Sequence, residues 1–159
     1  MSTRLLILCL LILTAALPAT AEELSRGQTL YLPIYSHIWH GDVVVDHKYP
    51  LKSQVSALVS LRNTSLKTPI SIRSARYYST AGKLLREYAP KPVVIPPMGT
   101  HELFVERREE QGGSGANFVI EWQAADATNP PVVEAVHAEI KGHQTLTFIT
   151  SARPIQADK

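Results

Sequence analysis

The sequence contains a single cysteine, Cys9, which lies in an apolar stretch close to the N-terminus. We expect that stretch to be removed during export, so the remaining chain would contain no cysteine. Such a chain can form no disulfide and offers no thiol for catalysis or metal binding. Its stability must then come from a hydrophobic core, which residues 22–159 are numerous enough to build.

Long hydrophobic runs are also missing. The longest, residues 5–17, is too short to cross a bilayer core, which takes about 20 residues. It follows Arg4, ends at Pro18, and is succeeded by small residues up to Ala21. A basic start, a short apolar run and small residues at a cleavage point are typical of a secretory signal.

The export prediction sets the domain boundaries. We predict that residues 1–21 are a cleavable signal peptide and that residues 22–159 form one domain. This domain is expected in the periplasm or outside the cell, without membrane insertion after cleavage.

Neither sign of charge dominates. Lys and Arg number 16 against 14 Asp and Glu, and Arg4 belongs to the predicted signal, which leaves an excess of one positive charge. A nearly neutral chain has no electrostatic reason to bind nucleic acid or an anionic membrane surface. The expected partner is therefore an unknown protein or small ligand.

Segments of alternating polarity cover most of the chain, and turn residues separate them. Residues 55–62 place Val55, Ala57, Val59 and Leu61 on one face, which is the pattern of a half-buried strand. Nine such segments are predicted as strands: 29–39, 55–62, 70–77, 84–88, 93–95, 101–106, 118–122, 132–140 and 146–151.

Many short strands with frequent turns predict an all-β fold. We expect an immunoglobulin-like or fibronectin-like β-sandwich of about 7–9 antiparallel strands. Within it, Pro33 is expected to kink the first strand, and a bulge is expected near Ser74, where the alternation changes phase.

Three segments carry a family resemblance: residues 30–42 (LYLPIYSHIWHGD), 61–64 (LRNT) and 112–122 (GGSGANFVIEW). They resemble a family of exported bacterial proteins known as domain of unknown function 3124. The similarity extends over about residues 30–151, and its most specific part is the glycine-rich segment. The resemblance implies a bacterial, periplasmic or extracellular protein, and it supplies no activity or site residue.

Histidines and aspartates gather near the start of the predicted domain. Imidazole and carboxylate groups are ligands for zinc and copper, so His37, His40, Asp42 and His47, with Asp46 beside them, are the candidate metal site. Residues three apart on a regular strand point to opposite faces, so His37 and His40 could share a metal only across a turn or bulge. The alternative is structural: the two histidines form hydrogen bonds at a strand end. His101, His137 and His143 could add ligands from other strands.

A glycine-rich loop is the other candidate site, formed by Gly112, Gly113, Ser114, Gly115 and Asn117. It leads into a strand without a following lysine, which argues against a phosphate-binding loop. The glycines either allow positive φ angles in a tight loop or form part of a recognition surface.

No catalytic arrangement is evident in the sequence. Ser36 and His37 are neighbours on a strand and face opposite ways, and Ser114 lacks the second glycine of a nucleophile elbow, since Ala116 stands there. We therefore predict a non-catalytic binding or accessory module of unknown ligand, without a cofactor. The alternative function is zinc or copper binding.

Overall fold

The computed structural model describes residues 23–42 and 50–156, and over these residues the chain is all β, without a helix. None of the described residues belongs to a helix that could span a membrane. The strands number twelve: β1 (Ser25–Ile34), β2 (His37–His40), β3 (Leu51–Gln54), β4 (Ser56–Arg62), β5 (Ile70–Tyr78), β6 (Leu84–Glu87), β7 (Val93–Ile95), β8 (Thr100–Val105), β9 (Ala116–Thr128), β10 (Val132–Lys141), β11 (Gln144–Ser151) and β12 (Arg153–Ile155).

The expected number of 7–9 strands was too low. The first predicted strand is divided into β1 and β2, and the short strands β3 and β12 were not predicted. Lys52 in β3 and Arg153 and Pro154 in β12 disfavour a strand on local propensity. Pairing with β2 and β1, respectively, overrides that preference.

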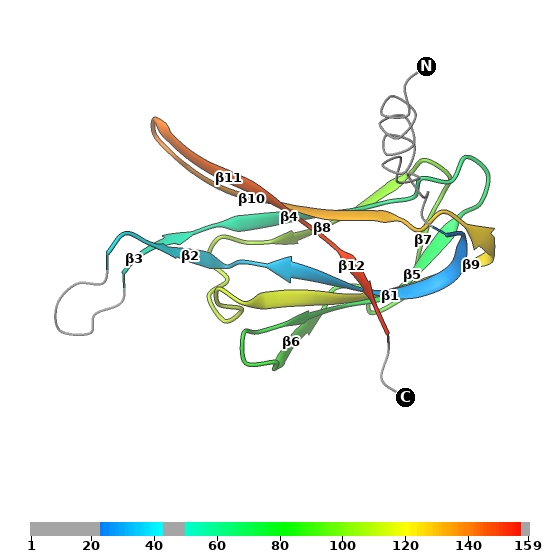
Figure 1. The fold of residues 1–159 in the computed structure, drawn as a ribbon, viewed down its shortest axis with the longest axis horizontal. Helices are drawn as coiled ribbons and strands as arrows, with labels where there is room; N and C mark the ends of the chain where they lie inside the picture. The colour runs from blue at the N-terminus through cyan, green and yellow to red at the C-terminus, as the bar shows by residue number, and fades with distance from the viewer. Residues whose placement is uncertain (1–22, 43–49, 157–159) are drawn as a thin grey trace, which may run out of the picture.

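Two larger antiparallel sheets make up the body of the molecule (Figure 1). The six-stranded sheet has the order β12-β1-β9-β5-β6, with β7 also paired to β5, and the four-stranded sheet has the order β11-β10-β4-β8. The third sheet is the two-stranded hairpin β2–β3. Edges of both larger sheets therefore lie on the same side of the molecule, at β6 and β8.

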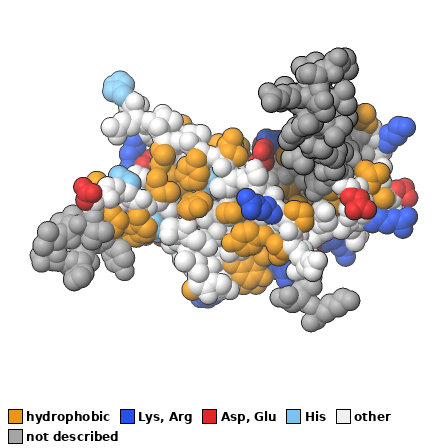
Figure 2. All heavy atoms as spheres, in the orientation of Figure 1, with side chains coloured by type: hydrophobic (Ala, Val, Ile, Leu, Met, Phe, Trp, Pro, Cys, Tyr) orange, Lys and Arg blue, Asp and Glu red, His pale blue; other side chains and the backbone are white. Residues whose placement is uncertain are grey.

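Two hairpins project from one end of this body (Figure 1). In the first, β2 continues the path of β1 and β3 continues into β4, so the hairpin joins a strand of each large sheet. In the second, β10 and β11 extend past the end of β4. On the face that Figure 2 presents, hydrophobic side chains gather over the middle of the molecule and most charged side chains lie towards its ends.

One hydrophobic core lies between the two large sheets. Alternate residues of each strand point inwards, as the period of two predicts, and together they form a single buried cluster. Burying a large apolar side chain contributes about 1.5–3 kcal/mol, so this cluster is the main source of stability. Trp122 is its largest member, and its largest fully buried members are Leu32, Ile34, Leu61, Ile70, Ile72, Tyr77, Ile95, Phe118 and Ile120.

The expected kink at Pro33 is wrong. β1 continues through Pro33, which pairs with Asn117 of β9. Tyr35 and Ser36 then separate β1 from β2. The carbonyl of Pro33 accepts a hydrogen bond from the Thr150 hydroxyl (2.7 Å), so it points away from β9. Proline has no N–H, and the place that an N–H would take lies on the same side of β1 as this carbonyl, beyond the residues that pair with β12. No hydrogen bond between strands is therefore lost at Pro33.

The bulge expected near Ser74 is confirmed. β5 and β9 are in register at Ile72 and Trp122 and again at Ser74 and Glu121, so Arg73 is the extra residue. The extra residue shifts the inward face from even to odd positions, which brings Ala75 and Tyr77 into the core.

Asn63 organises the loops at the other end of the body. Its buried side-chain amide donates to the carbonyls of Thr68 (2.9 Å), Ile95 (3.2 Å) and Pro96 (3.1 Å). Its carbonyl oxygen accepts the N–H of Ser65 (3.0 Å). One side chain thus satisfies backbone groups of two loops, which gives the LRNT segment a structural role.

Candidate functional site

The histidine segment forms one strand of the projecting hairpin β2–β3. His37 lies opposite Gln54 and His40 opposite Leu51. The ring of His37 packs edge-on against Trp39 (4.9 Å between centroids), whereas Nε2 of His40 is hydrogen-bonded to the Ser53 hydroxyl (3.1 Å). His37 and His40 therefore occupy opposite faces of the hairpin, as their spacing of three implies.

The surroundings of His37 do not favour a cation. Burial lowers the pKa of His37, the nearby Lys52 ammonium lowers it further, and Glu110 partly opposes them. A metal ion at His37 would face the same Lys52 charge. His47 and Asp46 lie outside the described residues, Asp42 is exposed, and the described part of the chain brings together no three His, Cys, Asp or Glu side chains that could hold a metal.

The remaining histidines lie in separate places. His101 is half-buried in β8, and His143 is exposed at the turn between β10 and β11. His137 is fully buried, stacks on Phe148 (4.5 Å between centroids) and accepts the N–H of Tyr35 at Nε2 (3.1 Å). Burial lowers its pKa to about 4, so His137 is a neutral core residue at pH 7.

The glycine-rich loop is bound to the body by its own backbone. Its Gly112 carbonyl accepts hydrogen bonds from the Thr80 amide (2.7 Å) and hydroxyl (2.9 Å), and its Gly113 carbonyl accepts the Ser36 amide (3.0 Å). Thr80 Oγ1 also accepts the N–H of Gly115 (2.8 Å). Gly113 has a φ of 79°, the conformation that glycine adopts without strain.

Behind this loop lies a polar cluster, formed by the buried Ser36 and Tyr77 and the half-buried Glu109. Oε2 of Glu109 accepts hydrogen bonds from the Tyr77 hydroxyl (2.6 Å) and the Ser36 hydroxyl (2.9 Å). The amide of Gly112 donates to both oxygens of the same carboxylate (3.1 and 3.2 Å). Burial, and next the hydrogen bond to Glu109, raise the pKa of Tyr77 well above its ordinary value, so it remains a donor.

Gly112 is required by this cluster. A Cβ atom there would lie 1.9 Å from the Tyr77 hydroxyl and 2.6 Å from the Ser36 hydroxyl. A glycine is therefore needed at 112 because other side chains approach closely, and at 113 because the backbone has a positive φ. Of the other loop residues, Ser114 and Asn117 are half-buried and Gly115 is exposed, and their role as a recognition surface stays a prediction.

An open groove of 710 Å³ lies between the edges of the two large sheets. One wall is β6 with Tyr88, the other is β8, and one end is formed by the segment before the glycine loop. Glu109 lines this groove and also holds the buried cluster, so the two features are connected. The lining residues are Arg86, Tyr88, His101, Glu102, Leu103, Phe104, Glu106, Arg108 and Glu109.

The groove combines an aromatic surface with charges of both signs. The guanidinium of Arg86 lies over the ring of Tyr88, 4.5 Å from its centroid. Burial raises the pKa of the Tyr88 hydroxyl, which Arg86 partly opposes. Arg108 supplies a second cation, and three carboxylates face the same space. Such a surface offers stacking area, donors and acceptors to one ligand.

No sequence pattern indicates this groove. Its residues come from β6 and β8, which belong to different sheets and are not paired. Strand pairing order is needed to place them side by side.

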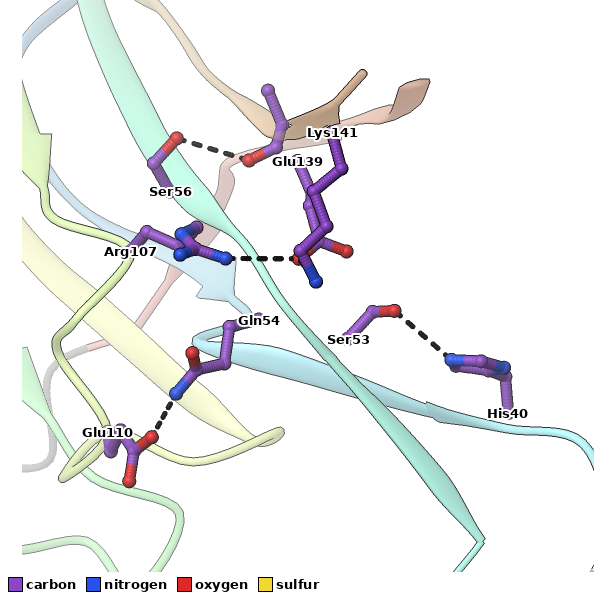
Figure 3. Close-up of polar contacts among 9 residues, drawn as sticks. His40, Ser53, Gln54, Ser56, Arg107, Glu110, Glu139 and Lys141 are labelled. Carbon is purple, nitrogen blue, oxygen red and sulfur yellow. Dashed lines mark hydrogen bonds and ion pairs between the residues drawn. The ribbon is translucent and has the colours of Figure 1, made fainter. Parts of the chain in front are cut away.

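A second hollow, of 560 Å³, lies between the two projecting hairpins. At its inner end, Glu139 forms ion pairs with Lys141 (2.7 Å) and Arg107 (3.3 Å), and the Glu139 side chain is 8 % exposed. Figure 3 shows these residues beside β3, where Gln54 donates to Glu110. Because its central charges are already paired with one another, this hollow is a weaker binding site than the groove.

Comparison with known proteins identifies the family. The model of a family described as protein of unknown function (DUF3124) matches residues 27–155. The chain belongs to this family. A search of curated proteins gives no match. Among solved structures, the crystal structure of Thermotoga maritima 1070 is similar at 10 % identity and a TM-score of 0.42, covering 79 % of this chain and 92 % of that one. A likeness this low carries no conclusion about fold or function.

Proposed function

We propose that this DUF3124 protein is an exported, non-catalytic binding module that holds a segment of a partner protein in the groove between β6 and β8. The observation that carries the proposal is the groove itself, which joins an aromatic surface to both signs of charge at the open edge of two sheets. Concave sites with a few convergent polar groups are where proteins bind ligands.

Export is part of the proposal. It rests on the basic, apolar and small-residue pattern of residues 1–21. The immunoglobulin-like sandwich is likewise proposed. Two antiparallel sheets around one core support it, and so do loops and hairpins gathered at the two ends.

A binding role fits Glu109 better than a catalytic one. Its carboxylate already accepts hydrogen bonds from Tyr77, Ser36 and Gly112, so Oε2 is occupied and the group is held in place. A general base needs a free oxygen within hydrogen-bond reach of a substrate proton. Glu109 instead holds one end of the groove rigid, and rigidity favours affinity because less freedom is lost on binding.

The alternative, zinc or copper binding by His37, His40, Asp42 and His47, has no contact among the described residues in its favour. His37 and His40 lie on opposite faces of β2, and Lys52 stands beside His37. It therefore remains a prediction from the sequence.

Photo-crosslinking in the organism of origin tests the groove. Arg108 would be replaced by p-benzoylphenylalanine, with the same replacement at Lys67, an exposed cation in the loop between β4 and β5, as the matched control. We expect one discrete protein adduct from position 108 and none from position 67. Charge reversal by Arg86→Glu, which alters the groove but not the core, should remove that adduct. Equal adducts from both positions, or none from position 108, would contradict the proposal.

A further inference from the structure

β11 is an edge strand without the usual protection against pairing. Its eight residues, Gln144–Ser151, include no charge, no proline and no glycine. Natural proteins protect sheet edges with charged residues, proline or short strands, because an exposed edge pairs with other chains. A long, uncharged edge is therefore a surface that a partner strand covers.

The other outer strands of the two large sheets do carry such protection. β8 contains His101 and Glu102, and β6 is only four residues long and contains Arg86 and Glu87. β12 is three residues long and contains Pro154. The contrast with β11 is thus a property of that strand rather than of the fold.

The position of β11 leaves its outer side open. It pairs with β10 from Glu134↔Ser151 to Lys141↔Gln144, and no other described strand pairs with it. The hairpin β10–β11 projects from the body (Figure 1). Near its end, the Thr150 side chain turns to the Pro33 carbonyl, so the free stretch is residues 144–149, with Leu146 and Thr147 at its middle.

The outer face of the same sheet is apolar in one row. Ile149 lies opposite Val136, Val136 opposite Leu58, and Leu58 opposite Phe104, one residue from each strand. Three of these side chains are well exposed: Ile149 (60 %), Phe104 (54 %) and Leu58 (37 %). The row ends at β11, where a further strand would continue it.

We propose that β11 pairs with β11 of a second copy of this chain, antiparallel and across a two-fold axis, joining two four-stranded sheets into one. In a two-fold pairing the residue at the axis faces its own copy, so a charge there would meet a like charge, and an uncharged strand avoids this repulsion. β11 meets this condition over its whole length. Strand addition takes its affinity from backbone hydrogen bonds, and the self-complementary side chains of β11 favour a second copy as the strand that is added.

The two-fold axis lies between the two strands, and it must be level with one residue of each strand rather than midway between two residues. Only then do outward side chains of one strand lie opposite outward side chains of the other. An axis at Thr147 places Thr147 opposite its own copy, Thr145 opposite Ile149, and Leu146 opposite Phe148. Each of these is a favourable cross-strand pair of β-branched or apolar residues.

Single-cysteine variants test this register. In a Cys9→Ser background the introduced thiol is the only one in the chain. Thr147→Cys should form a covalent dimer on mild oxidation, because residues directly opposite have Cβ atoms close enough for a disulfide. Thr100→Cys, at an exposed threonine on the opposite edge of the same sheet, is the matched control and should form no covalent dimer on a non-reducing denaturing gel.

Sedimentation equilibrium provides the second test. The wild-type chain should have twice the monomer mass, and Thr147→Lys should have the monomer mass with unchanged circular dichroism, because two ammonium groups would face each other across the axis. Thr100→Lys should remain dimeric. A wild-type chain of monomer mass, or equal covalent dimer from Thr147→Cys and Thr100→Cys, would overturn the proposal. Neither result depends on occupancy of the groove, which lies at the other edge of the sheet.

Discussion

The hydroxyl of Tyr77 in β5 donates a 2.6 Å hydrogen bond to Oε2 of Glu109, which lies in the loop between β8 and β9. This bond fixes the segment that forms one end of the groove to the core of the six-stranded sheet. Because the acceptor is a carboxylate, the bond is of the stronger, charge-assisted kind.

Tyr77→Phe should destabilise the protein by about 1–3 kcal/mol. The ring keeps its core contacts, but Glu109 and Ser36 lose a hydrogen-bond partner in a place with little access to water. Urea unfolding followed by tryptophan fluorescence measures the change. Tyr31→Phe, in an exposed position of β1, is the control and should have little effect. Equal effects of the two substitutions would show that the Tyr77 hydroxyl contributes nothing specific.

Gly112→Ala should be strongly destabilising, by about 2–4 kcal/mol, because its methyl group would overlap the Tyr77 hydroxyl. Removing that hydroxyl relieves the closest contact. The effect of Gly112→Ala should therefore be smaller in a Tyr77→Phe background, and a double-mutant cycle measures the difference. Strict additivity of the two free-energy changes would contradict the close contact.

Asn63→Ala should cost about 2–4 kcal/mol of stability. It leaves the carbonyls of Thr68, Ile95 and Pro96 without their shared donor. Thermal unfolding by calorimetry is the measurement. Thr64→Ala, which removes only one long hydrogen bond of 3.4 Å, is the neighbouring control. We expect the Asn63 variant to melt well below the Thr64 variant, and similar melting temperatures would refute the central role of Asn63.

His137 should make the protein less stable in acid. Its pKa in the folded state is about 4, below the ordinary value of 6.5 in the unfolded chain. As the pH falls through 6.5 the unfolded chain binds the proton first, so stability declines between pH 6.5 and about 4. The loss attributable to this residue is on the order of 3 kcal/mol.

His137→Gln tests that dependence. The variant cannot titrate, so its free energy of unfolding should change less than that of the wild type between pH 7 and pH 4. His143→Gln, at the exposed turn, should keep the wild-type dependence. If His137→Gln and the wild type lose the same free energy in acid, another group is responsible.

Metal titration separates the two interpretations of the histidine segment. Zinc–nitrogen bonds are about 2 Å long, so two ligands of one ion must converge on it. Because His37 and His40 lie on opposite faces of the hairpin, we expect His37→Ala and His40→Ala to leave metal content unchanged. Elemental analysis of the purified protein, with zinc and copper titration, measures this. Stoichiometric metal that both variants abolish would instead establish the metal site.

Local sequence patterns were sufficient for much of the fold. The phase change between Ile72 and Ala75 predicts the bulge, and the spacing of three predicts the opposed faces of His37 and His40. Both follow from the period of two along a single strand. Leu58 is an apolar residue on the outer face of its strand, and its neighbours across the sheet, Val136 and Phe104, account for it.

The groove and the buried cluster depend on long-range pairing instead. Ser36, Tyr77 and Glu109 come from three distant segments, and nothing near any of them in the sequence indicates the others. The sequence predicts positive φ angles for the glycines of the loop, whereas the structure requires Gly112 because the Tyr77 hydroxyl approaches it closely. Such contacts become visible only once the strand order is known.

The strand order also determines when this protein can finish folding. β1 lies between β9 and β12, so both neighbours of the first strand are far away along the chain. Pairing between distant segments raises the contact order and slows folding. During synthesis, β1 has no partner until residues 116–128 have left the ribosome, and the sheet lacks its outer strand until residues 153–155 follow. Completion of the six-stranded sheet is therefore a late step of folding.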